Sequence, residues 1–210
     1  MKAILMSIRP EWCNLIIRGQ KTLEVRRTRP KLEVPFKVYI YCTKAPQHLI
    51  TIFKDGEEIE DGEIHHGKPM FLKCDKYLPD GIRDKTQMVI GEFICNDIRR
   101  IGPEYCVVKE DIESAISGSC LTVPQVKDYA GWKSGMSYAD LKDMYGWHIS
   151  DLKIYDEPVK LKDFWAIQPC THRGDCCTCR RWDAEKLICR GEAFGIERPP
   201  QSWYYVEDGG

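Results

Sequence analysis

The sequence lacks the short motifs that mark the commonest nucleotide-using enzymes and zinc proteases. It has no GxxxxGK(S/T) phosphate loop, no nucleophile elbow, no HExxH helix and no GxGxxG fingerprint. These motifs cradle phosphates with backbone amides, expose a nucleophile on a sharp turn, or set two histidines on one zinc ion. The sequence therefore gives no support to common nucleotide hydrolases, kinases, zinc proteases or dinucleotide-dependent enzymes.

Long apolar runs and a strong charge of one sign are also missing. No run reaches the roughly 18 apolar residues of a membrane span, and residues 1–6 are too short for a signal-peptide core. We therefore expect a cytoplasmic protein with no membrane partner. The formal net charge is −1 and the pI is about 6.5. Tight nucleic-acid binders are usually more basic, so a nucleic-acid site here has to be a local patch.

The pattern that is present is that of one globular domain of 210 residues. Alternating or apolar runs predict strands, and capping signals predict helices. Gly91, inside the most apolar run, predicts a bulge or a close approach of two backbones. Strands with interspersed helices and no regular βαβ alternation predict an α+β fold. The strands are expected at 3–7, 21–27, 37–42, 88–95, 147–155 and 201–206, and the helices at 10–18, 108–117, 122–129 and 137–145.

The stretch from Gly19 to Arg26, with the sequence GQKTLEVR, is the centre of the prediction. Gly19 ends the helix that precedes it, and apolar and polar residues then alternate as in a half-buried strand. Lys21 and Glu24 are three residues apart, so a regular strand would put them on opposite faces. They can face one cleft only if Lys21 still belongs to the turn after Gly19.

The run Gly-x-Lys-x-x-Glu-x-Arg at 19–26 resembles the signature of the ASCH domain, a small β-barrel similar to the PUA RNA-binding domain. Residues 7–10 (SIRP) are similar to the first strand of that family, and residues 198–203 (RPPQSW) to the closing strand of its prophage-type members. With residues 145–151 between them, the resemblance spans almost the whole chain. It implies one domain over 1–210, folded as a closed or nearly closed barrel with peripheral helices.

Residues 49–74 read as a hairpin inserted into that domain. Asp55-Gly56 is a two-residue turn signal, and the segment is rich in glutamate and aspartate. A solvated surface excursion is the simplest interpretation. A contact surface for a protein partner is the alternative.

A second insertion, 166–195, holds five of the eleven cysteines. The spacing of Cys170, Cys176, Cys179 and Cys189 predicts a structural Zn²⁺ site, because a CxxC pair lets two thiolates reach one tetrahedral ion at about 2.3 Å. Cys177 or His172 could replace one ligand. An iron–sulfur cluster and a redox-active or disulfide-forming loop stay open as alternatives. The remaining cysteines are expected to be small buried hydrophobes: Cys13, Cys42, Cys74, Cys95, Cys106 and Cys120.

The signature itself predicts a cleft for RNA or for a nucleotide or modified nucleoside. Cations in such a cleft hold phosphates or base acceptors, and an aromatic side chain stacks on a base. An ion-pair network that only stabilises the helix-to-strand turn is the structural alternative. The candidate ligand-binding residues are Lys21, Glu24, Arg26, Arg27, Trp12 and Trp203.

Two other functions remain open. Some small ASCH members are amidohydrolases that act on N4-acetylcytidine, and the resemblance implies that Lys21 would match their catalytic lysine. Lys21 and Glu24 are then the candidate catalytic residues. Those members carry a threonine at the position of Glu24, so the glutamate favours binding over hydrolysis. The third candidate is a protein-interaction module of prophage origin that uses the 49–74 hairpin or the metal loop.

Overall fold

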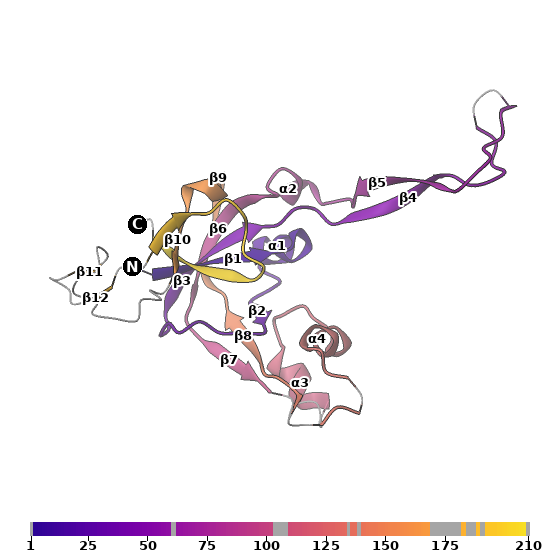
Figure 1. Cartoon of the computed structure of the whole chain (residues 1–210). Helices are drawn as coiled ribbons and strands as arrows, with labels where there is room; N and C mark the ends of the chain where they lie inside the picture. The colour runs from indigo at the N-terminus through magenta and orange to yellow at the C-terminus, as the bar shows by residue number, and fades with distance from the viewer. Residues whose placement is uncertain are drawn as a thin grey trace.

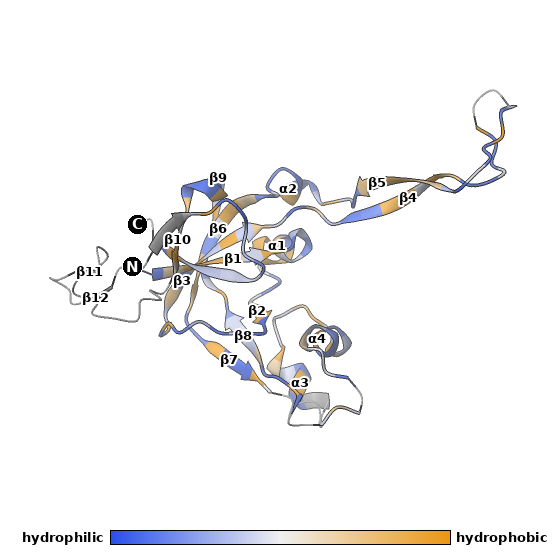
Figure 2. Cartoon of the chain, in the orientation of Figure 1, coloured by the Kyte–Doolittle hydropathy of each residue, from blue (hydrophilic) through white to orange (hydrophobic). Residues whose placement is uncertain are grey.

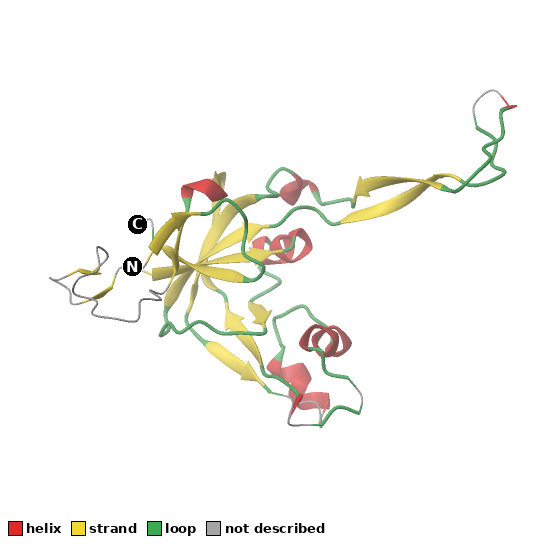
Figure 3. Cartoon of the chain, viewed as in Figure 1, coloured by secondary structure: helices red, strands yellow, loops and turns green. Residues whose placement is uncertain are grey.

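The computed structural model of the chain describes residues 2–59, 62–102, 109–133, 135–137, 140–168, 182–183, 188–189 and 192–208 (Figure 1). Of residues 109–110, 168, 182–183, 188–189 and 192–194 it describes the backbone alone. Strands dominate, and the helices are short (Figure 3). The predicted α+β class is confirmed in this sheet-dominated form.

The largest sheet has seven strands in the order β13-β10-β14-β1-β3-β6-β9. It is mixed, because β1 pairs in parallel with β3 and antiparallel with β14. The two ends of the chain therefore meet in the middle of this sheet, where β1 and β14 lie side by side (Figure 1). The strands are β1 (Lys2–Ile8), β3 (Phe36–Cys42), β6 (Met88–Cys95), β9 (Ser150–Lys160), β10 (Trp165–Gln168), β13 (Glu192–Gly195) and β14 (Trp203–Glu207).

A second sheet has the order β2-β8-β7, and two hairpins stand apart from both sheets. The chain passes from the second sheet to the first at Ile149, whose backbone N–H donates to the carbonyl of Thr22. These elements are β2 (Leu23–Arg26), β7 (Ile98–Ile101) and β8 (Met144–His148), with the hairpins β4 (Gln47–Phe53)–β5 (Met70–Asp75) and β11 (Trp182–Asp183)–β12 (Ile188–Cys189).

The closed barrel that the resemblance implied is not found. Within the described ranges, no strand ladder joins β13 to β9 or the large sheet to the small one. Polar–apolar alternation identifies a strand and its buried face, but it carries no information about which strands pair at the ends of a sheet. The positions of the strands could therefore be predicted from the sequence, but whether the strands close into a barrel could not.

The helices are α1 (Pro10–Ile17), α2 (Asp80–Arg83), α3 (Lys109–Ala115), α4 (Val123–Ala130) and the 3-10 turn η4 (Leu161–Asp163). Thr122 and Gln125 form a capping box at the start of α4, and Gly131 ends it in the left-handed conformation. The helix predicted at 137–145 is wrong, because residues 144–148 form β8 and pair with both β2 and β7. None of the helices in the described part of the chain is long and apolar enough to cross a bilayer.

Two apolar clusters lie near the turn between α1 and β2. On one side, Cys13 and Ile16 of α1 pack with β1, β3 and β6 around the fully buried Trp147. On the other side, Val25 of β2 packs with residues of α3, α4, β7 and β8, including Val126. All four residues of β2 are buried. The fold thus carries Glu24 and Arg26 into the interior although both are ionisable.

The cysteines outside the second insertion only partly match their prediction. Cys13, Cys42 and Cys95 are buried free thiols. Cys74 is half-buried, and Cys120 is exposed, so the prediction for Cys120 is wrong. Cys120 has a φ of +59° in the loop before α4, where the backbone turns sharply and leaves the side chain outside the core. Cys106 lies outside the described residues.

Candidate functional site

The site begins at the turn between α1 and β2. Gly19 has a φ of +69° and ends α1, and the strand starts only at Leu23. The amides of Thr22 and Leu23 both donate to the carbonyl of Gly118, at 2.8 and 3.0 Å. Gly118 itself has a φ of +82°, and a Cβ there would collide with the Thr22 side chain. Lys21 therefore belongs to the turn, which is the condition under which it shares a cleft with Glu24.

The ammonium group of Lys21 is surrounded by acceptors. It donates to the carbonyls of Leu23 at 2.9 Å and Ser119 at 2.6 Å, and its Nζ lies 3.2 Å from Oε2 of Glu24. Two of the three N–H donors of the ammonium group are therefore used in hydrogen bonds, and the contact with Glu24 is an ion pair. The Nζ also lies 5.2 Å from the ring centre of Trp12. With 2% of its surface exposed, Lys21 is held rigidly.

Glu24 and Arg26 point to the same side of β2, since they are two residues apart. Oε1 of Glu24 lies 2.9 Å from Nη2 of Arg26. The same Nη2 donates to the carbonyl of Ser7 at 2.7 Å, and Nη1 lies 3.5 Å from Oγ of Ser202. Glu24 is 6% exposed and Arg26 7%. The three charged residues thus form one buried cluster of two cations and one carboxylate, which has an excess positive charge.

This cluster forms the floor of a cavity of about 500 Å³. Ser7, Trp12 and Val25 complete the inner wall. The mouth is lined by exposed residues from β1's end, from α4 and from the loop before β14: Arg9, Gln125, Asp128, Tyr129 and Gln201. Figure 1 shows α4 standing opposite α1 and β2. The volume lies within the range of small-molecule sites.

Several polar atoms of the floor have no hydrogen-bond partner. These are Oγ of Ser7, Nε of Arg26 and Oε2 of Glu24. Oε2 of Glu24 still has its ion pair with Lys21, in a geometry that is not a hydrogen bond. Buried polar groups normally have a partner, so these atoms are an exception, and they are closed off from solvent behind the surface of the cavity.

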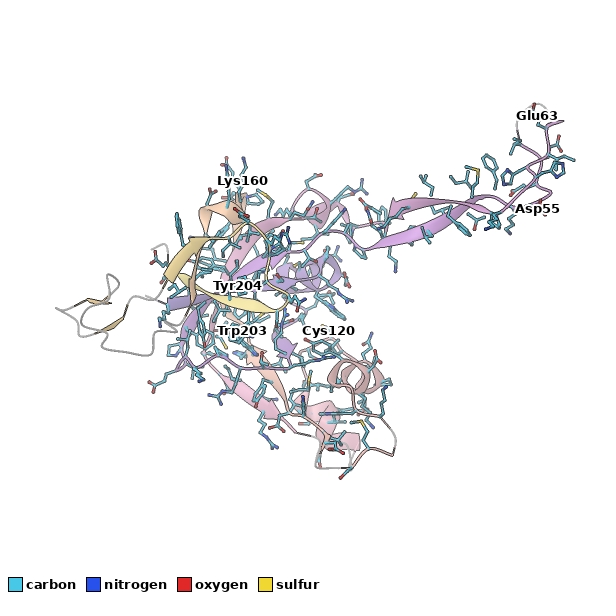
Figure 4. All side chains as sticks on the ribbon, in the orientation of Figure 1. Asp55, Glu63, Cys120, Lys160, Trp203 and Tyr204 are labelled. Carbon is cyan, nitrogen blue, oxygen red and sulfur yellow. The ribbon has the colours of Figure 1, made fainter. Side chains whose placement is uncertain are left out.

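Arg27 and Trp203 lie outside the cavity lining. Nε of Arg27 donates to the carbonyl of Tyr129 at 2.7 Å, and its guanidinium lies 5.0 Å from the Tyr129 ring centre. Arg27 therefore holds α4 against the end of β2. The ring of Trp203 packs on Trp147 and Tyr205, with its Nε1 3.2 Å from Oγ1 of Thr28. Figure 4 labels Trp203 on β14.

The sequence interpretation missed the contribution of α4 to the mouth. Gln125, Asp128 and Tyr129 come from a helix that is about 100 residues away along the chain. The capping box at Thr122 predicts that helix, but the apolar cluster of Val25 and Val126 and the contacts of Arg27 with Tyr129 bring it to β2. No local pattern carries that contact.

Cys13 lies in α1 next to Trp12. Burial chiefly, and the neighbouring Cys42 thiol, raise the pKa of the Cys13 thiol well above its usual range. A buried thiol with a raised pKa stays protonated at neutral pH and is a poor nucleophile. The chemistry available to the cavity is therefore that of the Lys21–Glu24–Arg26 cluster and the mouth residues.

The predicted zinc ligands cannot be placed. Cys170, Cys176 and Cys179 lie outside the described residues, as do Cys177 and His172, and only the backbone of Cys189 is described, in β12. Among the side chains that are described, no three His, Cys, Asp or Glu residues gather as a metal-binding group.

Comparisons with known proteins agree with the resemblance at 19–26. No functionally curated protein matches the chain. The crystal structure of ASCH from Zymomonas mobilis is 17% identical, with a TM-score of 0.42 over 76% of this chain and 73% of that one. A tyrosine-to-phenylalanine mutant of that protein is also 17% identical, with a TM-score of 0.43 over 77% of this chain and 77% of that one. The model of the ASCH domain family matches residues 6–153. Since this match covers more than half of the 210 residues, the protein belongs to the ASCH domain family.

Proposed function

We propose that the cavity above Lys21, Glu24 and Arg26 binds a nucleotide or a modified nucleoside, either free or as part of an RNA. The observation that carries the proposal is the convergence of two cations and one carboxylate on the floor of a cavity of about 500 Å³. Nucleobases present donors and acceptors side by side, and phosphates present acceptors alone. A floor that offers both kinds of group, with an excess positive charge, suits such a ligand.

Two aromatic side chains of the cavity support the same class of ligand. Trp12 on the wall and Tyr129 at the mouth are flat groups on which a base could stack, a contact of roughly 1–3 kcal/mol. The exposed Arg9 and Gln125 at the mouth leave room for a chain that continues beyond one nucleotide.

The conservative substitution Arg26→Lys tests the proposal. It keeps the charge and removes the planar fork that reaches Glu24, Ser7 and the cavity together. We expect nucleotides or short RNAs to bind about 10–100-fold more weakly, as for the loss of one or two hydrogen bonds from a charged group. Binding is measured by titration calorimetry against a panel of nucleosides, nucleotides and RNA oligomers at fixed salt.

The matched control is Arg99→Lys, which changes an exposed arginine of β7 in the same way. Affinity should be unchanged in that variant. Thermal melting of each variant separates lost binding from lost folding. If the wild-type protein binds no member of the panel at about millimolar concentration, the proposal fails and the ion cluster is a structural feature of the turn.

Hydrolysis of an N4-acylated cytidine is the second candidate, and the contact between Lys21 and Glu24 at 3.2 Å is the observation that favours it. One feature weighs against it. An amine that acts as a base needs a lone pair facing its substrate, whereas two backbone carbonyls and the Glu24 carboxylate surround the nitrogen of Lys21. The same purified samples, incubated with N4-acetylcytidine, decide between the two functions, because only the enzyme releases acetate with time.

We also propose a structural zinc ion held by Cys170, Cys176, Cys179 and Cys189. The support is the CxxC spacing in a stretch with few apolar residues of its own. Elemental analysis of untagged protein is expected to find one zinc per chain, and Cys176→Ser should lower this severalfold. Cys74→Ser, which changes a half-buried thiol of β5, should leave it unchanged. Iron in place of zinc, or no metal, would contradict the proposal.

A further inference from the structure

The β4–β5 hairpin and the described residues that flank it, 44–59 and 62–76, form an arm that projects from the body of the protein (Figure 1). In the described part of the arm, β4 and β5 pair only with each other, over the register from Gln47↔Asp75 to Phe53↔Met70. A two-stranded sheet is at best marginally stable in water when nothing packs on it. Each of its strands also leaves one backbone edge open for pairing.

The middle of the arm is apolar and uncovered. Ile50 pairs with Leu72, and the next pair along joins Thr51 with Phe71. Successive pairs face opposite sides of a hairpin, so both faces carry apolar side chains. Figure 2 shows hydrophobic colour along both strands. The apolar middle, 38–66% exposed, consists of Leu49, Ile50, Ile52, Met70, Phe71 and Leu72.

Charges of opposite sign flank this apolar middle. The tip, residues 54–68, has six acidic residues and two lysines. The base, residues 44–48 and 73–76, has three lysines and one aspartate, Asp75, which already accepts a hydrogen bond from the Gln47 amide at 2.7 Å. Figure 4 labels Asp55 and Glu63 at the far end of the arm. The order along the arm is therefore basic, apolar, acidic.

Within one arm, the tip and the base are too far apart to attract each other. β4 has seven residues, which at about 3.3 Å per residue separates them by roughly 20 Å. Electrostatic attraction between exposed charges is largely screened beyond about 8 Å at physiological ionic strength. The opposite charges of the tip and the base are therefore both available to a second molecule.

We propose that this second molecule is another copy of the same chain, and that the arms of two copies pack antiparallel about a two-fold axis through the apolar middle. A two-fold interface has to be self-complementary, so that each surface meets its own copy in the reverse direction. The arm meets that requirement, because the acidic tip of each copy then lies on the basic base of the other. The apolar middles bury each other at the centre, with charges at the rim, as in stable interfaces.

Other occupants fit the arm less well. A nucleic acid would be repelled by the acidic tip, and a partner of one charge would match only half of the arm. A second copy matches both halves and covers the apolar middle. The proposal is independent of the nucleotide site, because no residue of the arm lines that cavity.

Charge reversal tests the proposal. The tip variant carries Glu57→Lys, Glu58→Lys and Glu63→Lys, which changes the net charge of the tip from −4 to +2. The base variant carries Lys73→Glu with Lys76→Glu, which changes the net charge of the base from +2 to −2. Sedimentation equilibrium of the full chain is expected to show a dimer for the wild type. Each variant alone should raise the dimer dissociation constant about tenfold or more, since tip and base then carry like charges. An equimolar mixture of the two variants should recover the wild-type value, because each tip again meets a base of opposite charge.

The control is Lys153→Glu with Lys160→Glu, which reverses two exposed charges of β9 outside the arm and should leave the dissociation constant unchanged. Nucleotide binding should be the same in all of these variants. A wild-type protein that is monomeric up to about 1 mM overturns the proposal and leaves the arm to a different partner. A mixture that associates no better than the separate variants also overturns it.

Discussion

Replacing Glu24 with glutamine is expected to lower the free energy of unfolding by about 3–5 kcal/mol, the usual cost of removing one partner from a buried ion pair. Glu24 is the carboxylate between Nζ of Lys21, at 3.2 Å, and Nη2 of Arg26, at 2.9 Å. All three side chains are at most 8% exposed. Without the carboxylate, two cations remain buried side by side with only carbonyl and hydroxyl oxygens as acceptors. Urea unfolding followed by far-UV circular dichroism measures the change.

Glu11→Gln is the matched control for this substitution. Oε1 of Glu11 lies 4.0 Å from Nη1 of Arg9 in an exposed pair, which should contribute at most about 1 kcal/mol. A Glu24→Gln variant that is no less stable than Glu11→Gln would show that the cluster does not hold the turn together. In the double variant with Lys21→Met, the loss should be smaller than the sum of the two single losses, because the second change removes one of the unpaired cations.

The Glu24 experiment also separates the scaffold and binding interpretations of the signature. If the cluster only stabilises the turn, its substitution lowers the stability of the protein and affects no ligand binding. If the cluster also binds a nucleotide or RNA, the Arg26→Lys variant binds that ligand more weakly even though it stays folded. The excess positive charge of the cluster favours the second outcome.

Local signals predicted the parts of the site that are close in sequence. Pro10 at the first helical position and Gly19 after the last turn fixed α1, and alternation from Leu23 fixed β2. These two elements place Lys21 beside Glu24. The cavity needs more than that, because its mouth comes from α4 and from the loop before β14. Those contacts depend on packing between residues about 100 or more positions apart, which no local pattern reports.

The errors have the same origin. A helix was expected at 137–145 because Ser137, Asp140 and Gly146 resemble its caps, but residues 144–148 pair with the two neighbouring strands β2 and β7. Tertiary pairing overrides weak local preference. Gly146 is tolerated in β8 because the side chain of Leu23 fills the space where its Cβ would lie. The same glycine that suggested a helix end is thus a site of close packing in a strand.

Gly91 is the position where a single added carbon is expected to cost most in the large sheet. Gly91 lies in β6, between Ile40 of β3 and Ile154 of β9, and the register with β9 shifts on both sides of it. A Cβ at Gly91 would collide with the backbone carbonyl of Lys153 and crowd the Cα of Ile154. Backbone atoms of a paired strand cannot rotate away as a side chain does. Gly91→Ala should therefore lower the free energy of unfolding by about 1–3 kcal/mol, the range for overpacked interiors.

Gly81→Ala makes the comparison decisive, because it adds the same carbon where nothing lies within 4 Å. Gly81 is in α2, and alanine is preferred to glycine in a helix, so this variant should be neutral or more stable by up to about 1 kcal/mol. Thermal melting of both variants measures the difference. If Gly91→Ala melts at the wild-type temperature, the backbones of β6 and β9 do not approach each other closely enough at Gly91 to exclude a Cβ. If it melts several degrees lower while Gly81→Ala does not, Gly91 is required by the close approach of the two strands and not by glycine's flexibility.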